Sequence, residues 1–519
     1  MIGLVLGPAV LALLLSGGPA SHAVDPDEAR ISAILRQKVD EDRRMPGIAL
    51  ALVDASGIRT FHHGVACKGG APVSAETVFE TGSLTKPVTE ALMMRLEAAG
   101  KVKSSDTVTM LLAPRHRLES DAFGAVTLRQ LANHTSGLPR MPDDLENPAD
   151  YSAARAYAFL ARAKPANAGP GERLYSNFGY GLLGHLLELR TGQPYAALVA
   201  RYITKPLGMK SATFDAPQRN GACGHDEALD PVEPTTLGPI LAPAGGLKAS
   251  VYDMARFLRA SIGSGKGPAM KWGRLQDVRG LALISHDGST DGFFSFMTFD
   301  PAAGRGVVVL SNSRYDIRDV ALHLMQPAFP LVPRRVAVDH ADVDLEHLPG
   351  RYEEQGGGSF EIASYGHRLL MIREGQPMRE VFAEAPGRLF TDDAHPLTVE
   401  IEGAATKLSV YSRDGAAGKA TRRSAPTATF LPLNAADATR LAGRYRLPEG
   451  DELLVTSKHG RLYAQLTGQG TLEVLPLSPT ELVYRDVAAV LQFAPGDPSP
   501  SMAIVQGGNR TPGQRIAEP

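Results

Sequence analysis

Hydrophobic residues in the first 335 positions gather in short runs of two kinds. Compact apolar runs bounded by Gly, Asp and Ser predict β-strands, whereas apolar residues spaced three and four positions apart predict helices. Strands near both ends of this region, with helices between them, predict one sheet closed by distant segments and a helical lobe beside it. A cleft between the sheet and the lobe is the natural place for a site. The expected strands are 47–53, 59–65, 281–286, 293–299 and 306–310, and the clearest helices are 88–99 and 177–190.

The last third of the chain repeats itself. The string LPGRY at 348–352 returns as LAGRY at 441–445, an offset of 93 residues, and the same offset carries Arg368-Leu369 onto Arg461-Leu462. Several matches in one ungapped register indicate a duplicated module. Short apolar runs broken by Gly, Pro, Asp and Ser are typical of small antiparallel β domains, either barrels or sandwiches. We therefore expect two related β domains, residues 337–430 and 431–519, and place the chemistry before them.

The first 23 residues have the pattern of a secretory signal. An almost continuous apolar run, Ile2 to Leu15, is followed by Gly17-Gly18-Pro19, and Ser21-His22-Ala23 offers a small-x-small cleavage site. The run is too short to span a bilayer comfortably. No Lys or Arg precedes Arg30, so the positive charge that usually opens a signal rests on the α-amino group. We expect residues 1–23 to be removed, leaving a periplasmic or secreted protein without a stable membrane span.

Composition narrows the classes of function that remain. The chain has 519 residues, 43% of them hydrophobic and 21% charged, and its formal net charge is −2. The length predicts about three domains, and the near-neutral charge lacks the basic footprint of a nucleic-acid-binding protein. Two cysteines, Cys67 and Cys223, cannot build a disulfide scaffold or a cysteine-rich zinc module. They form either one disulfide or two isolated buried thiols, and both readings stay open.

The first motif with catalytic chemistry is Ser83-Leu84-Thr85-Lys86, which follows a glycine turn at Gly82 and opens a helix. Residues i and i+3 share one face of a helix, so the lysine amine can reach the serine hydroxyl. A desolvated lysine loses its proton readily and can then activate that hydroxyl. The helix start also offers the Ser83 amide to a developing oxyanion. The alternative reading is an ordinary surface helix start, and S-x-x-K alone does not decide between them.

The second motif is Tyr175-Ser176-Asn177, which leads directly into a predicted helix. A phenol beside an ammonium group can have its pKa lowered enough to move protons at neutral pH. The Asn177 amide can hold the lysine and donate to a substrate carbonyl. Read in isolation, the same string is equally compatible with a helix-capping asparagine next to a packed tyrosine.

The third motif, His286-Asp287-Gly288, ends a predicted strand. Glycine at a strand end lets a substrate approach the backbone closely, and the next amide, that of Ser289, can complete an oxyanion hole. The pattern H-x-G also occurs at residues 62–64, so position along the chain, and not the pattern, favours the later copy.

In this order, Ser83-x-x-Lys86, Tyr175-x-Asn177 and His286-x-Gly288 resemble the three motifs of the penicillin-recognising serine hydrolases. That family includes class C β-lactamases, D-alanyl-D-alanine carboxypeptidases, D-aminopeptidases and related esterases. Flanking strings agree, and the resemblance implies a β-lactamase-like domain over residues 24–330 of a multidomain α+β chain. The strings are FETG at 79–82, LANHTSGL at 131–138, PAGGL at 243–247 and DMARF at 253–257.

The resemblance also implies a role for each motif residue. Ser83 attacks the substrate carbonyl and forms an acyl-enzyme, while Lys86 and Tyr175 share the general-base and general-acid work. Asn177 orients the lysine and the substrate amide. The backbone amides of Ser83 and Ser289 hold the oxyanion, and water then releases the acyl group. No metal or organic cofactor is implied.

The departures from the family pattern concern the substrate. Relatives that hydrolyse β-lactams or D-alanyl-D-alanine often carry K-T-G where this chain has His286-Asp287-Gly288. The lysine and hydroxyl of K-T-G favour a substrate carboxylate, whereas Asp287 repels one and accommodates an amine. We therefore expect a hydrolase of peptides, amides or esters, with D-amino-acid derivatives as candidates, as in D-aminopeptidases. The alternatives are a β-lactamase or D,D-carboxypeptidase, and a sensor that is acylated without turnover.

Two further strings are interpreted as structural. GYGLLG at 179–184 matches the dinucleotide-binding pattern G-x-G-x-x-G, but it lies inside a predicted helix with no strand before it. His134 and the pair Gly245-Gly246 are interpreted as turn and packing residues.

Overall fold

The computed structural model of the chain describes residues 26–516 except for 114–121, 146, 166–172, 218, 227–228, 264–273, 333–334, 336, 339–344, 374–375, 392–396, 403–405, 412–416, 433, 449, 459, 468–470 and 507–508. The expected signal segment, residues 1–23, lies outside the described residues. Within the described part of the chain, no helix is both long enough and apolar enough to cross a membrane.

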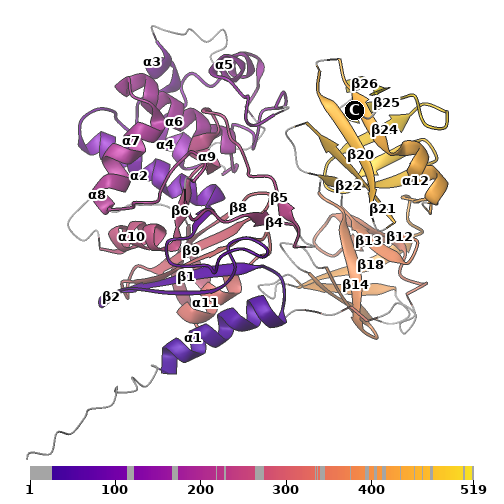
Figure 1. Cartoon of the computed structure of the whole chain (residues 1–519), viewed down its shortest axis with the longest axis horizontal. Helices are drawn as coiled ribbons and strands as arrows, with labels where there is room; N and C mark the ends of the chain where they lie inside the picture. Colours follow the sequence, from indigo (N-terminus) through magenta and orange to yellow (C-terminus); the bar gives the residue numbers. More distant parts are fainter. Residues whose placement is uncertain are drawn as a thin grey trace, which may run out of the picture.

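A six-stranded antiparallel sheet organises the first part of the chain, in the order β2-β1-β10-β9-β8-β7 (Figure 1). Its strands are β1 (Gly47–Asp54), β2 (Gly57–Gly64), β7 (Arg274–Val278), β8 (Leu281–Ser289), β9 (Phe294–Asp300) and β10 (Arg305–Ser311). Ile48 of β1 lies opposite Ser311 of β10, which confirms a sheet closed by distant segments. The sequence did not predict β7, because its string RLQDV has too few apolar residues to stand out.

Helices cover both faces of this sheet (Figure 1). One face carries α1 (Pro26–Arg36), followed by η1 (Gln37–Glu41), and α11 (Arg318–Met325). A helical lobe covers the other face, and two small two-stranded sheets accompany it. The lobe contains η2 (Gly82–Leu84), α2 (Thr85–Ala98), α3 (Val108–Leu112), α4 (Leu128–Ala132), α5 (Ala153–Arg162), α6 (Asn177–Thr191), α7 (Tyr195–Val199), η3 (Ala200–Thr204), α8 (Lys205–Leu207), α9 (Ala242–Gly245) and α10 (Val251–Ile262). The small sheets pair β3 (Val78–Glu80) with β6 (Lys248–Ser250) and β4 (Gly224–His225) with β5 (Pro231–Val232).

The residues of β1 explain why both faces are covered. Side chains alternate along a strand, and β1 is apolar at almost every position. Ile48 and Leu50 join the core formed with α1 and α11, whereas Ala49 and Ala51 join the core of the helical lobe. All four side chains are fully buried. The two alanines are small, so α10 packs directly against β1 on the lobe side.

Close packing inside the lobe depends on glycine in α6. A Cβ atom at Gly181 would lie 2.1 Å from the carbonyl oxygen of Ile240, and one at Gly184 would lie 2.3 Å from the ring of Pro243. The segment that leads into α9 therefore sits directly on α6. The G-x-G-x-x-G string is confirmed as helix interior, and its glycines serve this contact.

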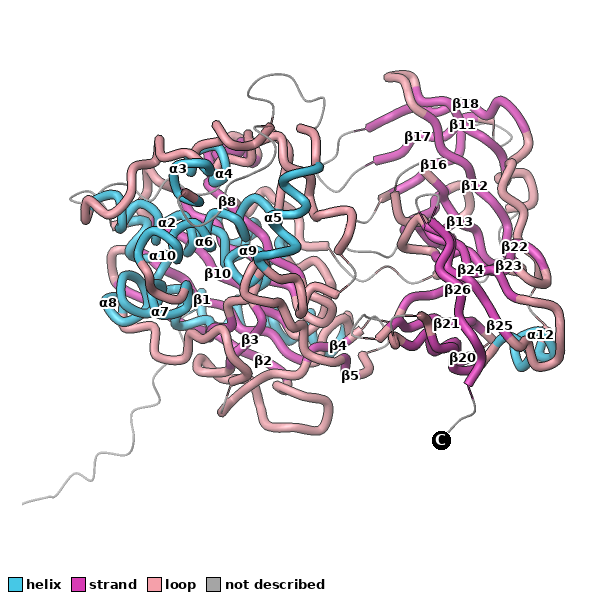
Figure 2. The backbone as a smooth tube through the Cα atoms, turned by 90° about the horizontal axis from the view of Figure 1, so that it is seen from above, coloured by secondary structure: helices cyan, strands magenta, loops and turns pink. Residues whose placement is uncertain are grey.

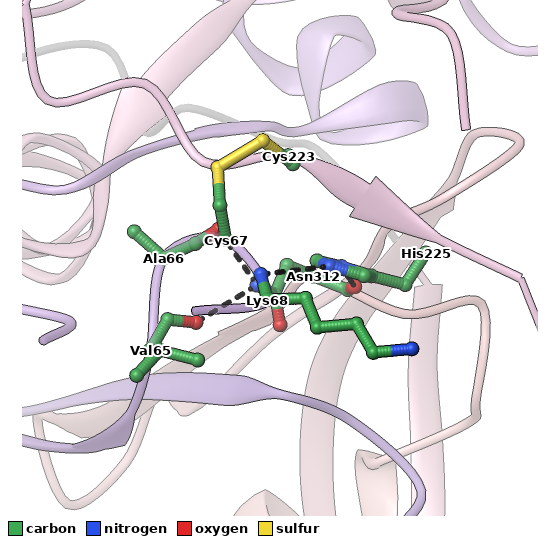
Figure 3. The surroundings of a disulfide bond; sticks show 7 residues. All are labelled: Val65, Ala66, Cys67, Lys68, Cys223, His225 and Asn312. Carbon is green, nitrogen blue, oxygen red and sulfur yellow. Dashed lines mark hydrogen bonds between the residues drawn. A yellow bond between two sulfur atoms is a disulfide. The ribbon is translucent and has the colours of Figure 1, made fainter. Parts of the chain in front are cut away.

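Cys67 and Cys223 form a disulfide, which answers the question that the sequence left open (Figure 3). Their Cα atoms are 4.9 Å apart. The bond ties the chain after β2 to the chain before β4, and the backbone amide of Cys223 donates to the carbonyl of Ala66. Beside it, the Asn312 side chain donates to the carbonyls of Val65 and Ala66. The amide of His225, two residues after Cys223, donates to the carbonyl of Gly292 in the turn after β8. The disulfide therefore stabilises the segment that contacts this turn.

Two closed, eight-stranded antiparallel barrels follow (Figure 2). They confirm the expected pair of small β domains and show that these are barrels, not sandwiches. The first comprises β11 (Gly350–Glu354), β12 (Ser359–Tyr365), β13 (Arg368–Ile372), β14 (Arg379–Ala385), β15 (Arg388–Thr391), β16 (Thr398–Glu402), β17 (Lys407–Tyr411) and β18 (Ala417–Ser424). The second comprises α12 (Ala435–Leu441) and then β19 (Gly443–Arg446), β20 (Glu452–Lys458), β21 (Arg461–Leu466), β22 (Leu472–Ser478), β23 (Glu481–Tyr484), β24 (Ala489–Phe493), β25 (Ser501–Gln506) and β26 (Asn509–Ile516).

The 93-residue repeat recurs in the contacts of the two barrels. The buried Tyr352 hydroxyl donates to the carbonyl of Leu348 at 2.7 Å, and the buried Tyr445 hydroxyl donates to that of Leu441 at 2.9 Å. Both tyrosines lie in the repeated string. In each copy the tyrosine of the repeated string therefore lies in the barrel core and bonds to the residue that opens the string.

Ion pairs join the barrels to each other, and they too occupy repeat-related positions. Arg368 of the first barrel lies 2.6 Å from Glu473 of the second. Arg461 of the second barrel lies 3.4 Å from Glu380 of the first. The second pair repeats the first, because both the two arginines and the two glutamates are 93 positions apart. The carboxylates are largely buried, and Arg368 also pairs with Glu380 at 2.7 Å. Charge-assisted contacts of this kind fix the orientation of the partners.

The second barrel also contacts the first part of the chain. Lys458 lies 3.0 Å from Asp230, and Lys68, next to the disulfide, lies 3.1 Å from the same carboxylate. The three side chains are exposed, so each pair contributes little to stability.

The α6 packing generates a testable prediction. Gly181→Ala places a Cβ atom against the Ile240 carbonyl, and overpacking of this kind costs about 1–3 kcal/mol. We expect a lower thermal unfolding temperature, because the Ile240 segment is displaced from α6. Gly356→Ala is the matched control, since no atom lies within 4 Å of its Cβ position. Equal unfolding temperatures for the two variants would contradict the packing argument.

Candidate active site

The S-x-x-K motif lies where a short 3-10 turn, η2, runs into α2. The turn is held from both sides: the Thr81 amide donates to the Leu247 carbonyl, and the Thr85 hydroxyl donates to the Gly82 carbonyl at 2.7 Å. Ser83 is partly exposed at this turn, and Lys86 is completely buried one turn later. The local structure therefore presents the serine to the outside and keeps the lysine inside.

Three of the predicted side chains meet at one atom. Lys86 Nζ lies 2.9 Å from Ser83 Oγ, and the Tyr175 hydroxyl lies 2.8 Å from the same oxygen. Lys86 Nζ also donates to the carbonyl of Ala244 in α9 at 2.7 Å. Sequence reasoning did not find Ala244, although the string PAGGL that contains it was noted as a flanking match. The carbonyl fixes the amine beside the serine without supplying a negative charge.

The pKa values of the two partners move in opposite directions. Burial lowers the pKa of Lys86 well below its usual range, the charge of Arg140 adds to this, and Asp287 opposes it. A neutral amine has a lone pair that can take a proton from a hydroxyl. Burial raises the pKa of Tyr175, which outweighs the lowering by Ser83 and Arg140. The expectation of a lowered tyrosine pKa is therefore wrong, because desolvation of the phenolate dominates, and Tyr175 rests as a proton donor.

His134 holds the second motif in place. It adopts a left-handed conformation with φ of 61°, and its buried ring stacks on that of Tyr175 with centroids 4.5 Å apart. Its Nδ1 accepts from the Ser176 amide at 3.0 Å, and its carbonyl accepts from the Leu174 amide at 2.8 Å. Burial, followed by the charge of Arg173, lowers the pKa of His134 to about 3, so the ring stays neutral and able to accept. His134 is therefore the turn and packing residue that was expected, and the ring it packs against is that of Tyr175.

The third motif brings the end of β8 against the serine. A Cβ atom at Gly288 would lie 2.2 Å from the Thr81 carbonyl oxygen and 2.8 Å from the Ser83 amide nitrogen, so only glycine fits here. The turn η2 and the end of β8 are therefore adjacent. The first contains the amide of Ser83, and the second contains the amide of Ser289. Two amides so placed can serve one oxyanion.

His286 and Asp287 lie on the same strand end. Burial lowers the pKa of His286 to about 4, so the imidazole is neutral at pH 7. Asp287 is half exposed and has an ion-pair partner that the sequence did not indicate, since Arg318 at the start of α11 lies 3.6 Å away. The competing H-x-G string at 62–64 is in β2, the strand at the far edge of the sheet from β8.

Asn177 starts α6 two residues after Tyr175, and its backbone amide donates to the Arg140 carbonyl at 2.9 Å. In the described part of the chain no hydrogen bond joins its side chain to Lys86, so its role toward the lysine stays a prediction. Among the described residues, no group of three His, Cys, Asp or Glu side chains is placed to hold a metal ion.

Comparison with known proteins identifies the family. The model of the family described as Beta-lactamase matches residues 31–328, which is more than half of the chain. The chain belongs to the Beta-lactamase family and is a serine hydrolase of the β-lactamase-related type.

Individual relatives agree with this assignment. The chain is 27% identical to a "Beta-lactamase" of Pseudomonas fluorescens, over 54% of this chain and 94% of that protein. It is 26% identical to "Penicillin-binding protein 4" of Amycolatopsis lactamdurans, over 61% of this chain and 95% of the relative. A crystal structure of "D-alanine Carboxypeptidase AmpC" from Burkholderia cenocepacia is similar, with a TM-score of 0.50 and 25% identity. The match covers 58% of this chain and 99% of that chain.

The contacts of His134 generate a prediction. His134→Ala removes the ring and the acceptor that position Tyr175, and we expect kcat to fall about tenfold, equivalent to about 1.4 kcal/mol, with little change in KM. Asparagine tolerates a positive φ and carries an acceptor at the position of Nδ1. We therefore expect His134→Asn to restore part of kcat. Steady-state kinetics of both variants provide the measurement, and equal losses in Ala and Asn would show that the acceptor does not matter.

Proposed function

We propose that Ser83 is the nucleophile of an acyl-enzyme mechanism that cleaves amide, peptide or ester bonds. The observation that carries this is the placement of Ser83 Oγ between the completely buried Lys86 amine at 2.9 Å and the Tyr175 hydroxyl at 2.8 Å. A hydroxyl is a weak nucleophile unless a base takes its proton, and the Lys86 amine is such a base.

Acylation then proceeds with protons moving over short distances. As Ser83 Oγ bonds to the substrate carbonyl carbon, its proton passes to Lys86 Nζ. The leaving group departs with the proton of the Tyr175 hydroxyl, and the Lys86 ammonium returns a proton to the phenolate. The site is thus restored with both groups neutral, which suits their burial.

The backbone amides of Ser83 and Ser289 hold the oxyanion during this step. In the second half water attacks the acyl carbon and gives a proton to Lys86 Nζ. The Ser83 oxygen leaves with the proton of the Tyr175 hydroxyl, the Lys86 ammonium reprotonates the phenolate, and the acid is released. The Asn177 side chain orients the substrate amide, and His286 and Asp287 line the acyl side beside Gly288.

The finer proposal concerns the substrate. Asp287 on β8 supports a substrate with an amine, and D-amino-acid derivatives are the first candidates. The names of the relatives, β-lactamase and D-alanine carboxypeptidase, support the second candidate, hydrolysis of β-lactams or D-alanyl-D-alanine ends. Both candidates use the same nucleophile and differ only in what the site binds.

Ser83→Ala tests the nucleophile. We expect turnover to fall at least a thousandfold while the thermal unfolding temperature stays within a few degrees, because Ser83 is partly exposed. Mass spectrometry of the wild-type protein, quenched during turnover, should show the acyl group on the peptide that contains Ser83. Wild-type rates in Ser83→Ala would end the proposal.

A parallel assay with nitrocefin and D-alanine p-nitroanilide separates the substrate candidates. Turnover of the anilide supports the first, and fast turnover of nitrocefin alone supports the second. An acyl adduct on Ser83 that persists without turnover of either compound would instead indicate a sensor.

We also propose that the protein is exported and loses residues 1–23. The disulfide between Cys67 and Cys223 supports this, because such bonds persist in oxidising compartments. The mass and N-terminal sequence of protein recovered from the periplasm or medium should begin at Val24. Recovery of a chain that still begins at Met1 would contradict the cleavage.

A further inference from the structure

The two sides of the site differ in charge, and the difference points to a substrate group. The strand side carries Asp287, already paired with Arg318, and a neutral His286. The helical side carries Arg140 and Arg173. Resting on the proposed function, we propose that Arg140 and Arg173 form an anion subsite that binds a carboxylate on the leaving-group part of the substrate.

Arg140 is fixed next to the reacting atoms. Its carbonyl accepts from the amides of Asn177 and Phe178 at 2.9 and 3.2 Å, so its backbone is held against the start of α6. Its guanidinium carbon lies 5.2 Å from the centre of the Tyr175 ring, whose hydroxyl contacts Ser83. The side chain is nevertheless exposed, so a ligand can reach it.

The acidic residues that follow Arg140 are engaged elsewhere. Asp143 lies 2.5 Å from Arg162, and Asp144 lies 3.2 Å from the same guanidinium. Asp144 also accepts from the Tyr151 hydroxyl at 3.0 Å. Arg140 itself has no ion pair within the described chain, so its charge is available.

Arg173 is the second arginine of the proposed subsite and is close to Tyr175 in the sequence. It is exposed and lies two residues before Tyr175, and the next amide, that of Leu174, is tied to the His134 carbonyl. A positive charge at Arg173 also lowers the pKa of His134, whose ring stacks on Tyr175. Like Arg140, it forms no ion pair with any residue that the structure describes.

The side of the substrate follows from the mechanism. In the proposed mechanism Tyr175 protonates the leaving group. Because Arg140 lies over the Tyr175 ring and Arg173 is two residues before it, we place the subsite on the leaving-group side. An arginine binds a carboxylate through two parallel hydrogen bonds, which makes it suited to this role. In relatives, K-T-G at the end of the strand favours a substrate carboxylate. In this chain the two arginines on the helical side would bind the carboxylate instead. A short peptide with a free C-terminus places its carboxylate at the arginines.

Binding of a matched pair of peptides tests this without relying on catalysis. The probes are D-alanylglycine and D-alanylglycinamide, which differ only in the terminal carboxylate, titrated calorimetrically into the Ser83→Ala protein. We expect the free acid to bind about five- to tenfold more tightly, as one exposed charge pair allows. This preference should shrink at high salt, because the arginines are exposed.

Substitution of the arginines is the decisive arm. Arg140→Gln and Arg173→Gln, singly and together, in the Ser83→Ala protein, should reduce the preference stepwise to about one, while amide binding changes little. Arg95→Gln, an exposed arginine near the end of α2, is the control and should keep the full preference. Equal binding of acid and amide, no binding of either, or a preference that survives both substitutions would overturn the subsite. Failure of the nucleophile appears separately, as retained turnover in Ser83→Ala.

Discussion

The site depends on one constraint, which is that the amine of Lys86 is completely buried, so that its pKa lies well below the usual range. Desolvation of an ammonium group is costly unless an anion compensates it, and the nearest fixed partner of Nζ is a carbonyl, that of Ala244. The surrounding structure maintains this state. Gly181 lets the segment before α9 sit on α6, which brings the carbonyl to the lysine, and the turn at Ser83 places the hydroxyl on its other side. A carboxylate in place of the carbonyl would keep the lysine charged and remove the base.

Much of this site could be predicted from the sequence, because its chemistry is local. Ser83 and Lys86 are one helical turn apart, so their contact follows from helix geometry alone. The contact with Tyr175 was expected from the order of the motifs and their family resemblance. The direction of the Tyr175 pKa shift could not be predicted, since it depends on burial by residues distant in sequence. The same holds for Ala244, the stacking of His134, and the pairing of Asp287 with Arg318.

The fold shows the same division. The strands of β1 and β8 to β10 stand out as apolar runs, and their presence at both ends of the region was enough to predict the closed sheet. Strand β7 carries too few apolar residues to be recognised and forms because β8 offers it an edge. The repeat revealed two related β domains, but closure depends on pairing between first and last strands, such as β11 with β18, and no local pattern encodes that.

The ion pairs between the barrels have a consequence for the architecture. Arg368 meets Glu473 and Arg461 meets Glu380, so each copy presents the same patch to the other. This is the isologous arrangement of a twofold homodimer, built here within one chain. In such an interface each copy covers the contact patch of the other. The same patch is then not available to a further copy of the module. Because a short connection joins the copies, their association is intramolecular and independent of protein concentration. The two copies therefore meet as a tethered pair, in which each copy covers the patch of the other.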